Sequence, residues 1–177
     1  MDKEKLLAKL RNIPDFPKPG IQFKDVESLY CDSACLRAIV DELAALYADK
    51  GITKVVGIDA RGFVLGAALA VRLGAGFVMC RKPGKLPGEK VSASFEKEYG
   101  TDTIEMHCGN IGPDDTVLIH DDLLATGGTL AAAARLTAGF SPKAVYINTL
   151  IELTGEGLHG RDALPSGMPY TALLTID

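Results

Sequence analysis

The chain has 177 residues and is 47% hydrophobic and 24% charged, a size and composition typical of one globular domain. Its net charge of -4 argues against nucleic-acid binding through a generally basic surface, and 6% aromatic residues with no tryptophan disfavour base-stacking platforms. The longest uncharged run of the first half is too short to span a bilayer, and the charged N-terminus is unlike a secretory signal. We therefore expect a cytoplasmic protein with no membrane or nucleic-acid partner.

The first 32 residues predict a short helix followed by an extended arm. The helix is expected over about Lys3 to Arg11. Residues 13–20 contain three prolines and a glycine, which exclude a helix or a central strand there.

From Ser33 onward, helix and strand patterns alternate. Apolar residues at three- and four-residue steps predict a helix that Ser33 caps and Gly51 ends. Strands that alternate with helices pair in parallel, and continuous apolar strands are covered on both faces. The sequence thus predicts a three-layer α/β/α domain with a mainly parallel central sheet. Helices are expected at 62–73 and 128–138, and strands at 54–58, 76–80, 115–120, 143–150 and 170–176.

The strongest motif follows the strand predicted at 115–120, where that strand is expected to stop at Asp121 and Asp122. These two carboxylates suit hydroxyl groups, or a divalent cation held through water. The glycines and the helix N-terminus that come next suit one phosphate group, and a sugar phosphate would satisfy both halves. A plain strand–turn–helix joint is the alternative. The phosphate-binding candidates are Ala125, Thr126, Gly127, Gly128 and Thr129.

Two further segments suit phosphate. The turn Asp59-Ala60-Arg61 follows the strand at 54–58, and its arginine can fork onto phosphate oxygens, although an ordinary turn with a surface arginine is the alternative. Residues 81–90 carry four basic side chains against one acidic one, with two prolines and two glycines. That segment is either a lid that closes over a polyanion or a solvated basic loop.

The stretch Asp121 to Thr129 resembles the motif with which type I phosphoribosyltransferases bind 5-phosphoribosyl diphosphate (PRPP). With Pro14-Asp15-Phe16-Pro17, the two segments above and Glu98-Tyr99-Gly100, it follows the order seen in the adenine phosphoribosyltransferases. The resemblance, over about Ile13 to Leu153, implies a single type I phosphoribosyltransferase domain (1–177) with an N-terminal hood (1–32) and a flexible lid loop (81–100). It also implies the conversion of adenine and PRPP to AMP and pyrophosphate in purine salvage, by a homodimer with small-molecule substrates.

The resemblance also implies roles for individual residues. Glu98 would be the catalytic acid with Arg61 as a second catalytic group, Tyr99 would belong to the lid, and the Asp59–Ala60 peptide would be cis. Mg²⁺ would be held mainly through PRPP, pyrophosphate and water, with no direct protein ligand. The implied pyrophosphate contacts are Asp59, Ala60, Arg61, Arg81, Lys82 and Lys85. The implied base contacts are Phe23, Lys24, Leu123, Ala125 and Leu153.

Several residues leave alternatives open. Gln22 and Lys24 depart from the commonest family pattern, so a phosphoribosyltransferase for xanthine or a 6-oxopurine is one alternative, and a non-catalytic PRPP-binding regulator is another. His120 is expected to be a core histidine, and His159 with Arg161 a surface turn.

The cysteines form no CxxC pair and have no histidine at zinc-finger spacing. Four free thiols in a reducing compartment are therefore expected. The alternative is a metal site that uses His107 and Cys108. The four are Cys31, Cys35, Cys80 and Cys108.

Overall fold

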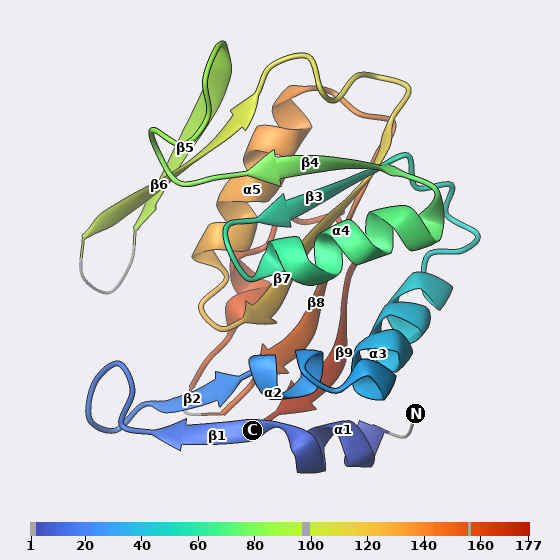
Figure 1. The fold of residues 1–177 in the computed structure, drawn as a ribbon. Coiled ribbons are helices and arrows are strands. Elements are labelled where there is room, and N and C mark those ends of the chain that lie inside the picture. Colours follow the sequence, from blue (N-terminus) through green and yellow to red (C-terminus); the bar gives the residue numbers. More distant parts are fainter. Residues whose placement is uncertain (1–2, 97–99, 156) are drawn as a thin grey trace. The chain divides into compact units, whose positions relative to one another are not determined.

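A five-stranded sheet, parallel throughout, forms the centre of residues 43–177 (Figure 1). The computed structural model describes residues 3–96, 100–155 and 157–177, and it separates into two units, Met1–Glu42 and Leu43–Asp177. The predicted α/β fold with a parallel central sheet is confirmed. In spatial order the strands are β4 (Gly76–Cys80), β3 (Lys54–Ile58), β7 (Thr116–Leu124), β8 (Ala144–Leu153) and β9 (Tyr170–Ile176).

Helices cover both faces of this sheet because alternate strand residues point to opposite sides. Val55 and Leu118 pack in one buried cluster with Ala70 of helix α4. The neighbouring residues along the strands, such as Val56, pack in the other cluster with Ala134 of helix α5. The continuous apolar strands are therefore buried on both sides, as a parallel sheet requires. Helix α4 spans Gly62–Leu73 and helix α5 spans Gly128–Gly139.

Strand β7 is longer than the sequence predicts. It continues past His120 to Leu124, because Leu123 and Leu124 still pair with β8. The expectation that the strand stops before Asp121 and Asp122 is therefore wrong, and both aspartates lie on the strand itself. The bounds predicted for β3, β4, β9 and α4 are confirmed.

An antiparallel pair of β5 (Lys90–Glu96) and β6 (Thr101–His107) follows β4; β5 lies within the predicted lid (81–100), and β6 begins directly after it. Its apolar side chains alternate with polar ones, and Phe95 and Met106 belong to the core cluster on the α5 side. The prolines and glycines of residues 83–88 dominate the sequence pattern here and conceal the strand that begins at Lys90.

The first unit begins with α1 (Lys3–Lys9) and an antiparallel pair, β1 (Arg11–Pro14) with β2 (Gln22–Asp25). Helices α2 (Glu27–Tyr30) and α3 (Ser33–Ala45) follow. The residue that caps α3 is Asp32 rather than Ser33, since Asp32 Oδ1 accepts hydrogen bonds from the backbone of Ala34 and Cys35. The helix ends at Ala45, and turns lead from there to Gly51.

All four cysteines are free thiols, as predicted. Within the described ranges, histidine, cysteine and acidic side chains form no group of three that is able to hold a metal ion, His107 and Cys108 included. None of the described helices combines the length and apolarity that a membrane crossing requires.

Candidate active site at the carboxyl ends of β3 and β7

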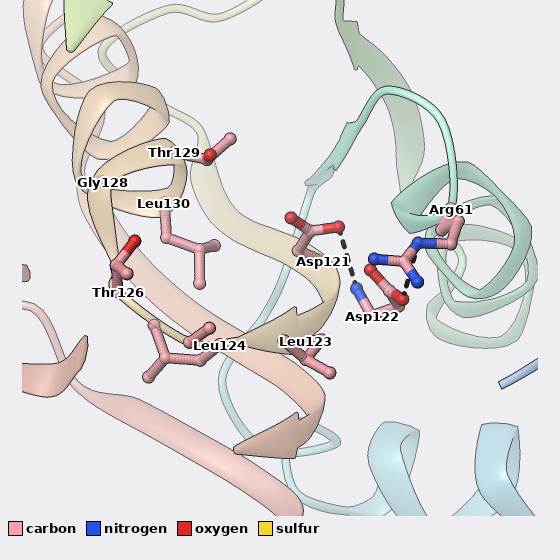
Figure 2. A pocket seen from close by; sticks show the side chains of 11 residues that line it. Arg61, Asp121, Asp122, Leu123, Leu124, Thr126, Gly128, Thr129 and Leu130 are labelled. Carbon is pink, nitrogen blue, oxygen red and sulfur yellow. Dashed lines mark hydrogen bonds and ion pairs between the residues drawn. The ribbon is translucent and has the colours of Figure 1, made fainter. Parts of the chain in front are cut away.

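Two cavities that share lining residues lie where β3 and β7 end, and Figure 2 shows the residues that line the first of them. The first, of about 180 Å³, is formed by the end of β7 and by residues 125–129, which we call the phosphate loop. The second, of about 370 Å³, is formed by the turn after β3, Lys82 and the β5–β6 hairpin. One ligand is therefore able to contact both. The shared residues are Arg61, Asp121, Asp122 and Thr129.

The phosphate loop leads directly into helix α5. Gly127 caps this helix with φ +83°, a conformation that favours glycine. A Cβ atom there would also lie 2.2 Å from the carbonyl oxygen of Gly160, so the position has no room for a side chain. Because the first backbone N–H groups of a helix have no partner within the helix, this end of α5 suits an anion.

The two aspartates differ in their contacts. Asp122 is 2% exposed, and Nε of Arg61 lies 3.1 Å from its Oδ2. Asp121 Oδ1 accepts a hydrogen bond of 2.9 Å from the backbone N–H of Asp122. Burial raises the pKa of both carboxyl groups; the charge of Asp122 raises that of Asp121 further, and Arg61 opposes the rise at Asp122.

Close packing of two elements brings Arg61 to this position. A Cβ atom on Gly62 would lie 2.9 Å from the carbonyl oxygen of His120 and 3.0 Å from Oδ1 of Asp121. Glycine therefore allows the first turn of α4 to lie directly against β7. Arg61, the residue before it, then faces the end of β7.

The turn after β3 has the predicted cis peptide between Asp59 and Ala60. The backbone N–H of Asp59 donates to the carbonyl of Cys80 over 2.9 Å, and its Oδ2 lies 3.0 Å from Nε of Arg81. Asp59, Ala60 and Lys82 line the second cavity. Arg81, whose guanidinium also lies over the Phe63 ring, lines neither cavity.

Residues 81–90 are bound to β6 at several points. Glu105 is the centre of these contacts: its carboxylate accepts from the backbone of Gly84 and lies 3.2 Å from Nζ of Lys90. His107 Nε2 lies 2.7 Å from the carbonyl oxygen of Pro87. Lys85 lines neither of the two cavities. A lid role for this segment stays a prediction, and Glu98 and Tyr99 lie outside the described residues.

The sequence did not single out three residues that line the second cavity. Phe95, Asp102 and Ile104 reach it from the β5–β6 hairpin. The alternation of apolar and polar residues from Val91 to Phe95 was the available signal, since this period of two is typical of a strand with one buried face.

The predicted base contacts fall in both units. Phe23 and Lys24 lie on β2, in the first unit. In the second unit, Leu123 and Ala125 line the first cavity, and Leu153 is the last residue of β8. Their role in base binding stays a prediction.

Two residues outside the cavities have structural partners. His120 is fully buried, as expected, with Nδ1 2.7 Å from Oδ1 of Asn148. Arg161 is not simply part of a surface turn, since it forms a two-pronged ion pair with the buried carboxylate of Glu152. The two residues are nine positions apart in the sequence and lie on different elements, so no helical or strand periodicity signals the pair.

Comparison with known proteins gives one family. The profile of the phosphoribosyl transferase domain matches residues 26–171. The adenine phosphoribosyltransferase of Phocaeicola vulgatus is 57% identical over 99% of this chain and 100% of its own length. Solved structures agree: that of the adenine phosphoribosyltransferase from Rhodothermus marinus has a TM-score of 0.91 at 48% identity, covering 98% of both chains.

The APRTase of Giardia lamblia, solved in complex with 9-deazaadenine, has a TM-score of 0.93 at 42% identity, covering 100% of this chain and 99% of its own. Relatives of such identity over the whole length share more than a fold. This chain belongs to the adenine phosphoribosyltransferases, within the phosphoribosyltransferase family.

Proposed function

We propose that this chain transfers the phosphoribosyl group of PRPP to adenine, forming AMP and pyrophosphate for purine salvage. The observation that carries the proposal is the pair of cavities with Arg61, Asp121, Asp122 and Thr129 in common. PRPP has a phosphate at one end, a diphosphate at the other and two hydroxyl groups between them. The two cavities and the carboxylates between them match that order of groups.

Each part of PRPP has a partner in this arrangement. The phosphate loop binds the 5′-phosphate through its backbone N–H groups and threonine hydroxyls. Asp121 and Asp122 accept hydrogen bonds from the two ribose hydroxyls. Arg61 and Lys82 face the diphosphate in the second cavity, and Arg81 and Lys85 join them when the lid closes.

The family resemblance assigns contacts with the base to Leu123, Ala125 and Leu153, and also to Phe23 and Lys24 of the hood. During the reaction the bond from ribose C1 to the diphosphate oxygen breaks, and the purine nitrogen bonds to C1. Adenine gives up the proton that it carries on N7 or N9 as N9 bonds to C1, and the Glu98 carboxylate, near N7, accepts that proton. Positive charge develops on the ribose, while the cationic groups stabilise the departing diphosphate.

Magnesium fits this site, because the carboxylates of Asp121 and Asp122, which line both cavities, are hard oxygen groups that suit a divalent cation held through water. No group of three histidine, cysteine or acidic side chains in the described ranges is placed to hold a metal. Most ligands of Mg²⁺ therefore come from the diphosphate and water. When bound, the ion neutralises diphosphate charge.

We further propose a homodimer that works in the cytoplasm. The dimer rests on the family resemblance. The proposed location in the cytoplasm is supported by the four cysteines, all of which are free thiols. Exposed thiols such as those of Cys31 and Cys108 stay reduced in a reducing compartment. Size-exclusion chromatography with light scattering tests the dimer.

The direct test is to incubate the purified protein with adenine, PRPP and Mg²⁺ and to measure AMP and pyrophosphate in equal amounts. EDTA in excess should abolish the reaction. Stabilisation by PRPP without any AMP formed would instead identify a non-catalytic regulator. A larger rate with xanthine or hypoxanthine than with adenine would identify the other alternative.

A further inference from the structure

The phosphate loop rests directly on the backbone of η1, a 3₁₀ helix that spans Gly160–Ala163. A Cβ atom on Gly127 would lie 2.2 Å from the carbonyl oxygen of Gly160 and 2.9 Å from Cβ of Ala163. A Cβ atom on Gly160 would lie 2.3 Å from the carbonyl oxygen of Ala125. Two glycines thus bring the two backbones into contact with no side chain between them, and a shift of η1 moves the loop.

Arg161 connects η1 to the central sheet. Its Nε and Nη2 donate to the two carboxylate oxygens of Glu152, which is 4% exposed on β8. Glu152 pairs in register with Leu124, the last residue of β7 before the phosphate loop. The anchor point of η1 is therefore on the strand beside the start of that loop.

The guanidinium group of Arg161 has a second contact that fixes its plane. Its Cζ lies 5.0 Å from the ring centroid of Tyr170, and the hydroxyl of Tyr170 lies 2.7 Å from Oγ1 of Thr149. Thr149 pairs in register with Asp121. The planar guanidinium group is thus held by the carboxylate at its edge and by the aromatic ring at its face, which makes the connection rigid. A lysine in its place would not reproduce both contacts.

We propose that Arg161 is a positioning residue for the 5′-phosphate: its ion pair with Glu152 holds η1 beneath the phosphate loop and so fixes the N–H donors of that loop. Arg161 itself lines neither cavity of the site, so it acts through the loop. This inference rests on the proposed function, because it assigns the 5′-phosphate to the loop.

The test separates the two ends of the ligand. Dissociation constants of ribose 5-phosphate and of Mg²⁺–pyrophosphate are measured by calorimetry on the full chain, with the melting temperature of each variant. Arg161→Ala should weaken ribose 5-phosphate binding about tenfold or more, because small displacements of a preorganised site are costly. Pyrophosphate binding should change less than about twofold, since Thr129 is the one residue of the phosphate loop that also lines the second cavity. Arg161→Lys should give the same pattern to a smaller degree.

Arg135→Ala is the matched control, since this exposed arginine on α5 donates one long hydrogen bond, of 3.5 Å, to the Ser94 carbonyl and lines neither cavity. It should leave both constants unchanged. Equal weakening of both ligands by Arg161→Ala, or of neither, would show that Arg161 only stabilises the fold and would overturn the proposal. If Arg161→Ala does not fold, the same comparison is decided with Arg161→Lys.

The dissociation constants do not depend on catalytic turnover. The proposed function and the positioning role of Arg161 can therefore be refuted independently of each other. A wild-type protein that forms no AMP refutes the proposed function whatever ribose 5-phosphate shows. A wild-type protein that forms AMP, with variants that bind ribose 5-phosphate normally, refutes only the role of Arg161.

Discussion

Nε of Arg61 lies 3.1 Å from Oδ2 of Asp122, so the turn after β3 is joined to the buried end of β7 at the boundary of the two cavities. The arginine side chain is 47% exposed while that of the aspartate is 3% exposed. The guanidinium group is therefore partly exposed to solvent at the edge of both cavities, while the buried carboxylate sets its position.

The first prediction concerns this arginine. Arg61→Ala should lower kcat/KM for PRPP about 100-fold, because it removes a preorganised cation from the departing diphosphate. Arg61→Lys should recover part of this loss, since it keeps the charge without the planar fork. Arg72→Ala, at an exposed position near the end of helix α4, should match the wild type in steady-state kinetics. A kcat/KM of Arg61→Ala within twofold of the wild type would remove Arg61 from the site.

The second prediction concerns the folding stability that the protein loses at neutral pH because Asp121 and Asp122 are buried side by side. Burial raises the pKa of Asp121, and the charge of Asp122 raises it further. A carboxyl group with a raised folded-state pKa favours folding at pH below its unfolded pKa, and this contribution is lost as the pH rises through the folded-state value. Asn at this position carries no charge and still accepts the hydrogen bond from Asp122.

Asp121→Asn should therefore melt at the same temperature as the wild type or higher at pH 7.5, while PRPP binding weakens. The gain in melting temperature should shrink as the pH is lowered toward 4, where the wild-type carboxyl group is itself protonated. Thermal denaturation from pH 4 to 8 measures this. A variant that is less stable than the wild type at pH 7.5 would contradict the proposed cost.

The third prediction concerns acid stability. Burial lowers the pKa of His120 to about 4, although the hydrogen bond with Asn148 partly opposes this. A base with a lowered folded-state pKa stays neutral in the fold while the unfolded chain takes up a proton. Stability should therefore fall as the pH drops from about 6.5 to about 4, by roughly 3 kcal/mol.

The double variant His120→Val/Asn148→Val should remove this acid sensitivity at little cost near pH 7, because both polar partners leave together. Urea denaturation at several pH values measures the slope. His159→Asn, at an exposed histidine, should keep the wild-type slope. An unchanged slope in the double variant would assign the acid sensitivity to other groups.

The fourth prediction concerns the choice of base. Adenine should be used at least about 100-fold better, in kcat/KM, than hypoxanthine or guanine, because a 6-oxopurine exchanges a donor and an acceptor at the recognised edge and leaves buried polar groups unpaired. Initial rates with each base at saturating PRPP measure this. Comparable rates with guanine or xanthine would exclude adenine specificity and leave the fold untouched.

Patterns in neighbouring residues correctly predicted the helices and strands whose bounds are set by nearby residues. The bounds of β3, α4 and β4 follow from apolar runs that begin or end near Gly62, Gly74 and Gly76, and the structure reproduces them. The end of β7 depends instead on pairing with β8, whose partner residues are 28 positions further along the chain (124 with 152), so the sequence pattern placed the two aspartates in a loop. Their burial follows from that pairing.

Contacts between segments that are distant in sequence could not be predicted for the same reason. The pair of Glu152 with Arg161 depends on how the chain returns after β8, and the packing of Gly127 on Gly160 depends on that same return. Phe95 reaches the second cavity because a hairpin forms after a segment rich in proline and glycine. Motif order identified the kind of site, while tertiary structure decided which side chains complete it.

The last prediction tests Glu98, which lies outside the described residues, as the proton-transfer group. Adenine carries a proton on N9 or N7, and the product carries ribose on N9, so the base must lose or shift a proton as the new bond forms. A carboxyl group near N7 serves this need, and exclusion of water by a closed lid would bring its pKa toward the working pH. Glu98→Gln keeps the shape of the side chain and removes its capacity to exchange a proton.

General acid–base assistance contributes roughly 10²–10⁴-fold, so Glu98→Gln should lower kcat by that order with little change in the KM for PRPP. Glu96→Gln is the matched control: Glu96 has the same chemistry two residues away, at the end of β5, and its replacement should be nearly silent. Single-turnover measurements over a range of pH values separate this chemical step from product release, and the profile of Glu98→Gln should lose one ionisation that the wild type shows. Equal effects of the two substitutions, or a kcat of Glu98→Gln above about a third of the wild-type value, would assign proton transfer to another group, because a missing general acid–base residue costs far more than threefold.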